Sequence, residues 1–118
     1  MNPAFLVGVG GALGAMARHA VYRRLLRDAR VPRATLAVNV VGSFVLGLVT
    51  AVQPAESVAL FVGTGACGAF TTFSSFSVET FDRLEAGDYV GAATNGALNL
   101  VASLAAVGAG FFVASLTA

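Results

Sequence analysis

Four long stretches of this chain contain no charged residue, and short polar segments separate them. The uncharged stretches are residues 1–17, 34–55, 57–78 and 89–118. A membrane-crossing helix needs about 20 mostly apolar residues, and the first stretch stays apolar past Arg18 to about Tyr22. The pattern predicts an all-α membrane protein in one domain, residues 1–118, with spans at approximately residues 4–24, 34–53, 57–79 and 88–115.

The composition also indicates a lipid environment. Hydrophobic residues make up 57% of the chain and charged residues only 11%, whereas a soluble domain carries charge on about a quarter of its residues. The net charge of +1 gives no reason to expect a nucleic-acid partner. The N-terminus has no Arg or Lys ahead of its apolar run, unlike a secretory signal peptide. We therefore expect the first span to remain in the finished protein, a multi-pass protein of the cell membrane.

The basic residues are all arginines, and most of them lie in two of the connections between spans. The first connection contains Arg23, Arg24, Arg27, Arg30 and Arg33, and the third contains Arg83. Short arginine-rich connections of membrane proteins stay in the cytoplasm. This distribution predicts that both connections are cytoplasmic and that both termini lie outside.

Two pairs of glycines stand four residues apart, Gly10 with Gly14 and Gly87 with Gly91. This spacing is typical of helices whose backbones approach closely. Glycine is also more frequent in membrane helices generally, which would leave such a pair without a role. The total of 14 glycines favours a tightly packed bundle and an oligomer.

The third uncharged stretch combines glycines with hydroxyl side chains. These residues are Gly63, Gly65, Gly68, Thr71, Thr72, Ser74, Ser75 and Ser77. Glycine weakens a helix, and Ser and Thr side chains compete for its backbone hydrogen bonds. We expect a broken helix, which a membrane tolerates only where the freed backbone groups are buried in protein or face water. The alternative is a continuous helix whose hydroxyl groups bond to the preceding turn.

Three residues in or beside these spans are candidates for a functional role. Phe73 and Phe76 are three apart, so they share one face of a helix, where such pairs most often serve packing or lipid contact. The electropositive edges of their rings would also favour an anion in a narrow path. Arg18 is the one charged residue inside a span and away from its ends. Such an arginine marks a functional site, unless it only extends to the cytoplasmic interface.

Polar residues also recur every four positions along two spans. The fourth span contains Asn95, Asn99 and Ser103, and the second contains Asn39 and Ser43. A four-residue step advances a helix by about one turn, so each set forms a polar stripe. Such stripes either join helices through hydrogen bonds or line a path with donors. Two stripes together favour a path.

The sequence lacks the residues that several classes of function need. No Asp or Glu lies inside the four uncharged stretches, so we expect no intramembrane carboxylate that binds and releases protons. We also find no catalytic grouping or cluster of metal-ligating side chains, and expect no enzyme. One alternative is a small four-helix multidrug–proton antiporter, which needs a glutamate in its first span, where residues 4–22 contain none. Another is a non-transporting accessory subunit, which has no need of a polar stripe or a broken helix.

Three segments of the sequence resemble the Fluc/CrcB family of fluoride channels, and the resemblance covers essentially the whole chain. The segments are GGALGAMARH at residues 10–19, ATLAVNVVGSFVLG at residues 34–47 and GACGAFTTFSSFSVET at residues 65–80. The last is the most specific, because it contains a glycine pair followed by TTFSxF in the third of four short spans. The resemblance implies a channel that exports fluoride from the cytoplasm down its electrochemical gradient and so lowers fluoride toxicity.

The resemblance also implies an assembly and a set of site residues. Members of the family form antiparallel dimers with two fluoride pathways and a sodium ion at the dimer centre. The sodium ion would be held by the backbone carbonyls of Gly68 and Thr71. The anion pathway would comprise Arg18, Asn39, Phe73, Phe76, Asn95, Asn99 and Ser103. Asn95 departs from the pattern, because several relatives carry a tyrosine there.

The uneven distribution of arginines bears on the dimer. A chain that inserts in both orientations should carry balanced arginines on its two sides, and this chain does not. One hypothesis is therefore that it inserts one way and pairs with an oppositely oriented sister chain. A homodimer is the alternative.

Overall fold

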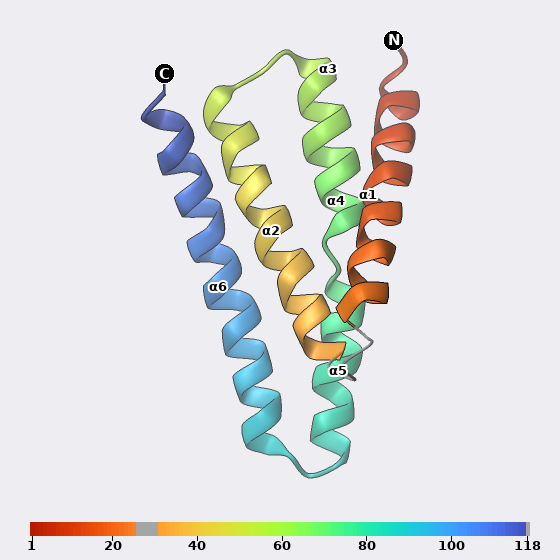
Figure 1. Cartoon of the computed structure of the whole chain (residues 1–118), viewed down its shortest axis with the longest axis vertical. Coiled ribbons are helices and arrows are strands. Elements are labelled where there is room, and N and C mark those ends of the chain that lie inside the picture. The colour runs from red at the N-terminus through yellow and green to blue at the C-terminus, as the bar shows by residue number, and fades with distance from the viewer. Residues whose placement is uncertain (26–30, 118) are drawn as a thin grey trace.

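The computed structural model describes residues 1–25 and 31–117, and almost all of them are helical. Within these residues, four helical segments are long and apolar enough to cross a membrane, which confirms the predicted all-α architecture (Figure 1). Three of the segments are single helices: α1 (Pro3–Leu25), α2 (Val31–Val52) and α6 (Tyr89–Ser115). The chain is therefore a multi-pass membrane protein.

The third segment, Glu56–Glu85, is divided at its middle, which confirms the predicted broken helix. Thr71 (ψ 159°) and Thr72 (φ −146°, ψ 116°) have extended backbones. The Thr72 side chain then caps the next helix by accepting a hydrogen bond from Ser75 N–H at 3.1 Å, as an N-cap threonine does. The parts of the segment are α3 (Glu56–Val58), a π-helical stretch η2 (Ala59–Cys67), α4 (Gly68–Phe70) and α5 (Phe73–Glu85).

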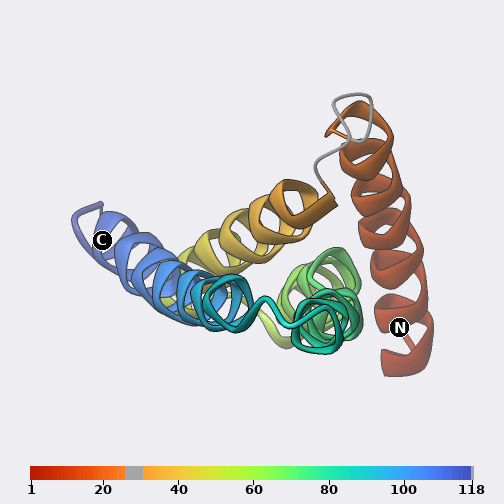
Figure 2. The same ribbon diagram turned by 90° about the horizontal axis from the view of Figure 1, so that it is seen from below.

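The third segment lies between α1 and the other two long helices. In the view along the bundle, α1 is on one side of it, and α2 and α6 pack together on the other side (Figure 2). The two termini lie at the same end, and α5 and α6 extend past α1 and α2 at the opposite end (Figure 1). Arg23 and Arg24 form the last turn of α1, whereas Arg27 and Arg30 lie outside the described residues.

Close backbone contacts hold α1 against the third segment. A Cβ atom at Gly10 would overlap the carbonyl oxygen of Phe61, and one at Gly14 would overlap that of Ala66. The same kind of contact joins α2 to α6, where Gly47 meets the carbonyl oxygen of Val107. Small residues allow these close approaches. They matter because lipid supplies no hydrophobic force between helices, so that close packing has to hold the helices together.

The second glycine pair has a different role from the one its spacing suggests. Gly87 has a positive φ of 78° in the turn between α5 and α6, and a Cβ atom there would meet nothing within 4 Å. Gly91 lies under the side chain of Asp88, which accepts a hydrogen bond from Gly91 N–H at 2.9 Å and so caps α6. The expectation of helix packing at Gly87 and Gly91 is therefore wrong, because one glycine makes the turn and the other leaves room for the cap.

Gln53 ends α2 with a φ of 48°, the left-handed conformation that side chains with a Cβ atom rarely adopt. We expect Gln53→Gly to raise the free energy of unfolding by up to about 1 kcal/mol, because the strain of about 1–2 kcal/mol is relieved and the greater freedom of unfolded glycine offsets part of the gain. Thermal unfolding in detergent measures the change. Gln53→Ala, which keeps the strain, is the control. A lower midpoint for the glycine variant would contradict the prediction.

Candidate functional site

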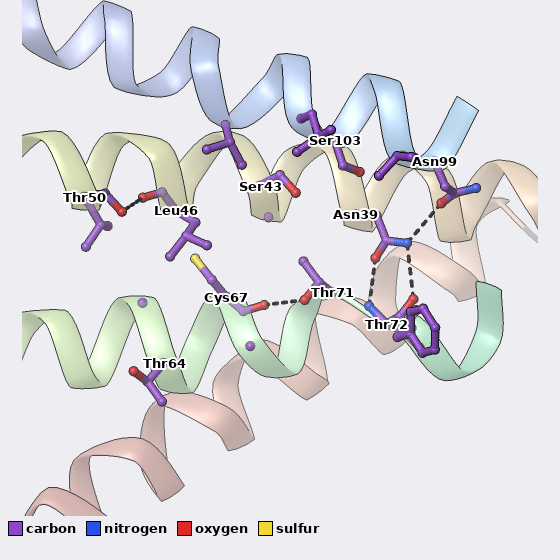
Figure 3. Close-up of a pocket in the computed structure, with 18 of the residues that line it drawn as sticks. Asn39, Ser43, Leu46, Thr50, Thr64, Cys67, Thr71, Thr72, Asn99 and Ser103 are labelled. Carbon is purple, nitrogen blue, oxygen red and sulfur yellow. Dashed lines mark hydrogen bonds between the residues drawn. The ribbon is translucent and has the colours of Figure 1, made fainter. Parts of the chain in front are cut away.

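A groove of about 990 Å³ runs between α2, the third segment and α6. Most of its wall is apolar; Asn39, Thr72 and Asn99 lie together at the level of the break, whereas Thr50 and Thr64 lie further along the groove (Figure 3). Seven of the predicted anion-path and sodium-site residues line it, from three different helical segments: Asn39, Gly68, Thr71, Phe73, Phe76, Asn99 and, further along α6, Ser103. Asn95 and Arg18 are not among the lining residues.

At the break, the side chain of Asn39 replaces the missing helical partners of Thr72. Its Oδ1 accepts a hydrogen bond from Thr72 N–H at 2.8 Å, and its Nδ2 donates to the Thr72 carbonyl at 3.2 Å. The exchange imitates the pairing between two β-strand residues and occurs where Thr72 is almost fully buried, with 6% of its surface exposed. Buried backbone groups without partners are costly in a membrane. Asn39 therefore stabilises the broken conformation.

The same amide begins a chain of hydrogen bonds that crosses to α6 and back to α5. Asn39 Nδ2 donates to Asn99 Oδ1 at 3.0 Å, and Asn99 Nδ2 donates to the Asn95 backbone carbonyl at 3.0 Å and to Asn95 Oδ1 at 3.3 Å. Asn95 Nδ2 donates to Thr80 Oγ1 at 3.0 Å, and Thr80 donates to the Phe76 carbonyl at 2.8 Å. Asn95 and Asn99 are buried, with 7% and 6% of their surfaces exposed. The polar stripe of α6 thus joins helices in this chain.

The two phenylalanines lie in the first turn of α5, directly after the break. Their ring centroids are 5.7 Å apart and their planes are tilted by 48°. Phe73 exposes 79% of its surface and Phe76 is partly buried. Both rings line the groove, so their electropositive edges are available to a small anion there.

Arg18 lines a separate cavity of about 520 Å³ between α1 and the start of α5. The hydroxyl groups of Ser74 and Ser75 line the same cavity, together with His19 and Tyr22. Arg18 is partly buried and His19 is exposed. The structure therefore brings Arg18 close to the break at Thr72, which this cavity shares with the groove, but on the opposite side of the third segment.

The carbonyl groups of Gly68 and Thr71 lose their helical donors at the break. In a continuous helix, Gly68 would accept from Thr72 N–H and Thr71 from Ser75 N–H. Here Thr72 N–H donates to Asn39 and Ser75 N–H donates to the Thr72 side chain. Both residues line the groove. Free carbonyl oxygens are ligands that hard cations accept, so the residues present fit a sodium ion.

A carboxylate lies deeper in the bundle than the sequence pattern indicated. Helix α5 continues to Glu85, and Glu79, at the end of the predicted span, accepts a hydrogen bond from the fully buried Thr35 of α2. The Thr35 hydroxyl also bonds to that of Tyr22 in α1. Glu79 Oε2 is buried without a hydrogen-bond partner in the part of the chain that the structure describes. Glu79, at the end of the predicted span, is therefore partly buried against α2, because the helix continues past the apolar run.

These features define the class of the molecule: a multi-pass helical membrane protein with a broken span beside a groove that is polar at the break. The chain belongs to the CrcB family, whose model, described as "CrcB-like protein, Camphor Resistance (CrcB)", matches residues 5–111.

Curated relatives support the same assignment. The chain is 49% identical over 108 residues to "Fluoride-specific ion channel FluC 2" of Haloarcula marismortui, covering 92% of this chain and 90% of the relative. It is 49% identical over 106 residues to "Fluoride-specific ion channel FluC 1" of Halobacterium salinarum, covering 89% and 87%. It is 44% identical over 119 residues to "Fluoride-specific ion channel FluC" of Idiomarina loihiensis, covering 96% and 92%. All three relatives are named as channels.

Proposed function

We propose that this protein is a fluoride-selective channel of the cell membrane that lets fluoride leave the cytoplasm. The observation that carries the proposal is the whole-chain identity of up to 49% with proteins named as fluoride-specific channels. The groove beside the break supports it, because it joins aromatic edges, hydroxyl groups and amides within a membrane-spanning bundle.

In this proposal, Phe73 and Phe76 favour a small anion in the groove through their ring edges. Arg18 attracts anions toward the break from the cavity on the other side of the third segment. Ser103 extends the polar lining along α6. Both amide hydrogens of Asn39 are already donated, one to Thr72 and one to Asn99. Fluoride would therefore gain a donor from Asn39 by replacing one of those two acceptors.

We further propose that two chains pair in opposite orientations along the groove. Phe73 and the groove wall face outward in a single chain, and two free carbonyls alone are too few to enclose a cation. Two chains would each supply the carbonyls of Gly68 and Thr71 to a structural sodium ion between them. The ion would fix the two breaks to each other through its charge.

The partner in such a dimer is either an identical chain or a sister chain. The described arginines Arg23, Arg24, Arg33 and Arg83 all belong to the end at which α5 and α6 meet, and the positive-inside rule places this end in the cytoplasm. A chain of one fixed orientation needs an oppositely oriented sister. A C-terminal tag that is equally accessible from both membrane faces would show that the chain instead inserts both ways and pairs with itself.

Fluoride efflux from liposomes tests the proposed function. The purified chain is reconstituted, and the release of fluoride is followed with an ion-selective electrode beside a chloride control. Rapid release of fluoride without chloride is expected. If the chain alone is inactive, the assay is repeated with a co-expressed sister chain, and absence of fluoride release from both preparations would overturn the proposal.

The aromatic pair gives a more specific prediction. Phe76→Ile keeps an apolar side chain but removes the electropositive ring edge, and we expect fluoride efflux to fall by up to about tenfold, since aromatic electrostatic contacts contribute about 0.5–1.5 kcal/mol. Phe112→Ile is the matched control, because Phe112 is exposed on α6 near the C-terminus and does not line the groove. Equal rates for both variants would argue against a role for the ring.

A further inference from the structure

The amide chain between α2, α6 and α5 has one direction of donation from end to end. It begins at Asn39, passes through Asn99 and Asn95, and ends through Thr80 on the Phe76 carbonyl. An asparagine side chain has a donor end and an acceptor end. Each member of the chain therefore fixes which end its neighbour presents.

Both ends of this hydrogen-bond network are bound to the start of α5, one at Thr72 and the other at Phe76. Asn39 binds the backbone of Thr72, the cap of α5, and Thr80 binds the carbonyl of Phe76 one turn further on. Phe73 lies between these anchor points. The network thus fixes the first turn of α5, which carries both groove-lining rings, against α2 and α6.

Asn95 and Thr80 occupy the part of the network that the groove does not reach. Neither residue lines the groove, and Asn95 is buried. Asn95 Oδ1 accepts from Asn99, and Asn95 Nδ2 needs the Thr80 oxygen as its acceptor. Without Thr80, nothing favours the present orientation of the Asn95 amide. Asn99 Nδ2 then loses one of its two acceptors, Asn95 Oδ1, and keeps only the Asn95 backbone carbonyl.

We propose that Asn95 and Thr80 are positioning residues for the anion path: they set the orientation of the Asn99 and Asn39 amides, and through them the geometry of the break, without contacting the anion. This inference rests on the proposed function. The sequence pattern placed Asn95 in the lining of the anion path. Here its amide instead bonds to the Asn99 amide and does not line the groove.

Thr80→Val tests the inference, because valine keeps the shape of threonine and removes only the hydroxyl. We expect fluoride efflux to fall by about tenfold, and Thr80→Ser, which restores the hydroxyl, to remain within about twofold of the wild-type rate; a tenfold change corresponds to about 1.4 kcal/mol. Asn95→Leu should lower efflux at least as much. The control Thr94→Leu makes a similar change at the neighbouring, exposed position of α6 and should leave the rate unchanged.

A second measurement reads the hydrogen-bond chain without any transport. The side-chain amide resonances of Asn39 and Asn99, recorded by NMR in detergent micelles, should shift in Thr80→Val and return in Thr80→Ser, although neither amide bonds to Thr80. Unshifted resonances, or a valine variant that conducts at the wild-type rate, would overturn the inference. A wild-type chain that releases no fluoride with or without its sister would overturn the proposed function and this inference with it, while shifted resonances would still report the amide chain.

Discussion

Gly14→Leu is expected to prevent α1 from packing on the third segment, so that the protein no longer folds. A Cβ atom at Gly14 would overlap the carbonyl oxygen of Ala66 and approach its carbonyl carbon and Cα. All three are backbone atoms, so no side-chain rotation relieves the overlap. Overpacking costs about 1–3 kcal/mol even where side chains can yield, and we expect more than about 3 kcal/mol here. Size-exclusion chromatography in mild detergent should show loss of the monodisperse protein.

The matched control is Gly8→Leu, on the same helix and less than two turns away. A Cβ atom at Gly8 meets nothing within 4 Å, so this variant should elute as the wild type does and should retain fluoride efflux. If Gly14→Leu gave the same yield and elution volume as Gly8→Leu, close contact between α1 and the third segment would not be a requirement of the fold.

Asn39→Leu should have the second largest effect. It leaves the buried N–H and carbonyl groups of Thr72 without partners and removes the first donor of the amide chain. An unsatisfied buried group costs about 1–3 kcal/mol, so two such groups predict a loss of about 2–6 kcal/mol in the free energy of unfolding. We expect a lower thermal midpoint in detergent and no measurable fluoride efflux from any protein that still folds.

Thr50→Leu is the control for this change. It replaces a polar residue of the same helix with leucine, but the Thr50 hydroxyl bonds to the Leu46 carbonyl in its own preceding turn and, among the described residues, to no other helix. Its effect on stability should be within about 0.5 kcal/mol, as for most exposed substitutions. If both variants lost a similar amount of unfolding free energy, Asn39 would act through the stability of α2 itself and not through its hydrogen bonds to Thr72.

The number of spans and their order along the chain could be predicted, because a helix needs a minimum apolar length to cross the lipid. Uncharged stretches separated by arginines and acidic residues identified four spans, and glycine followed by hydroxyl residues located the break within the third. The π-helical stretch Ala59–Cys67 was not predictable in this way. This stretch also packs closely on α1, where a Cβ atom at Gly65 would meet the Val7 carbonyl oxygen, and no local pattern encodes that contact.

The candidate site was predictable as a set of residue types but not as a set of contacts. Spacing placed Asn95, Asn99 and Ser103 on one face of a helix, and the structure keeps Asn99 and Ser103 at the groove. It could not show that Asn95 turns toward Thr80, because the partner lies on another helix. Glu79 was missed for a similar reason: an acidic residue at the end of an apolar run looks solvated until Thr35 is seen beside it.

The exchange between Asn39 and Thr72 has a consequence for the order in which the chain is made. Asn39 precedes Thr72 by 33 residues, so during synthesis it enters the membrane before the broken segment does. The backbone groups freed at Thr72 therefore have their partner in an earlier helix and do not depend on a later one. Asn99 follows Asn39 by 60 residues and joins a hairpin whose break is already satisfied. Asn39, which binds the backbone at the break, is thus synthesised before the break itself.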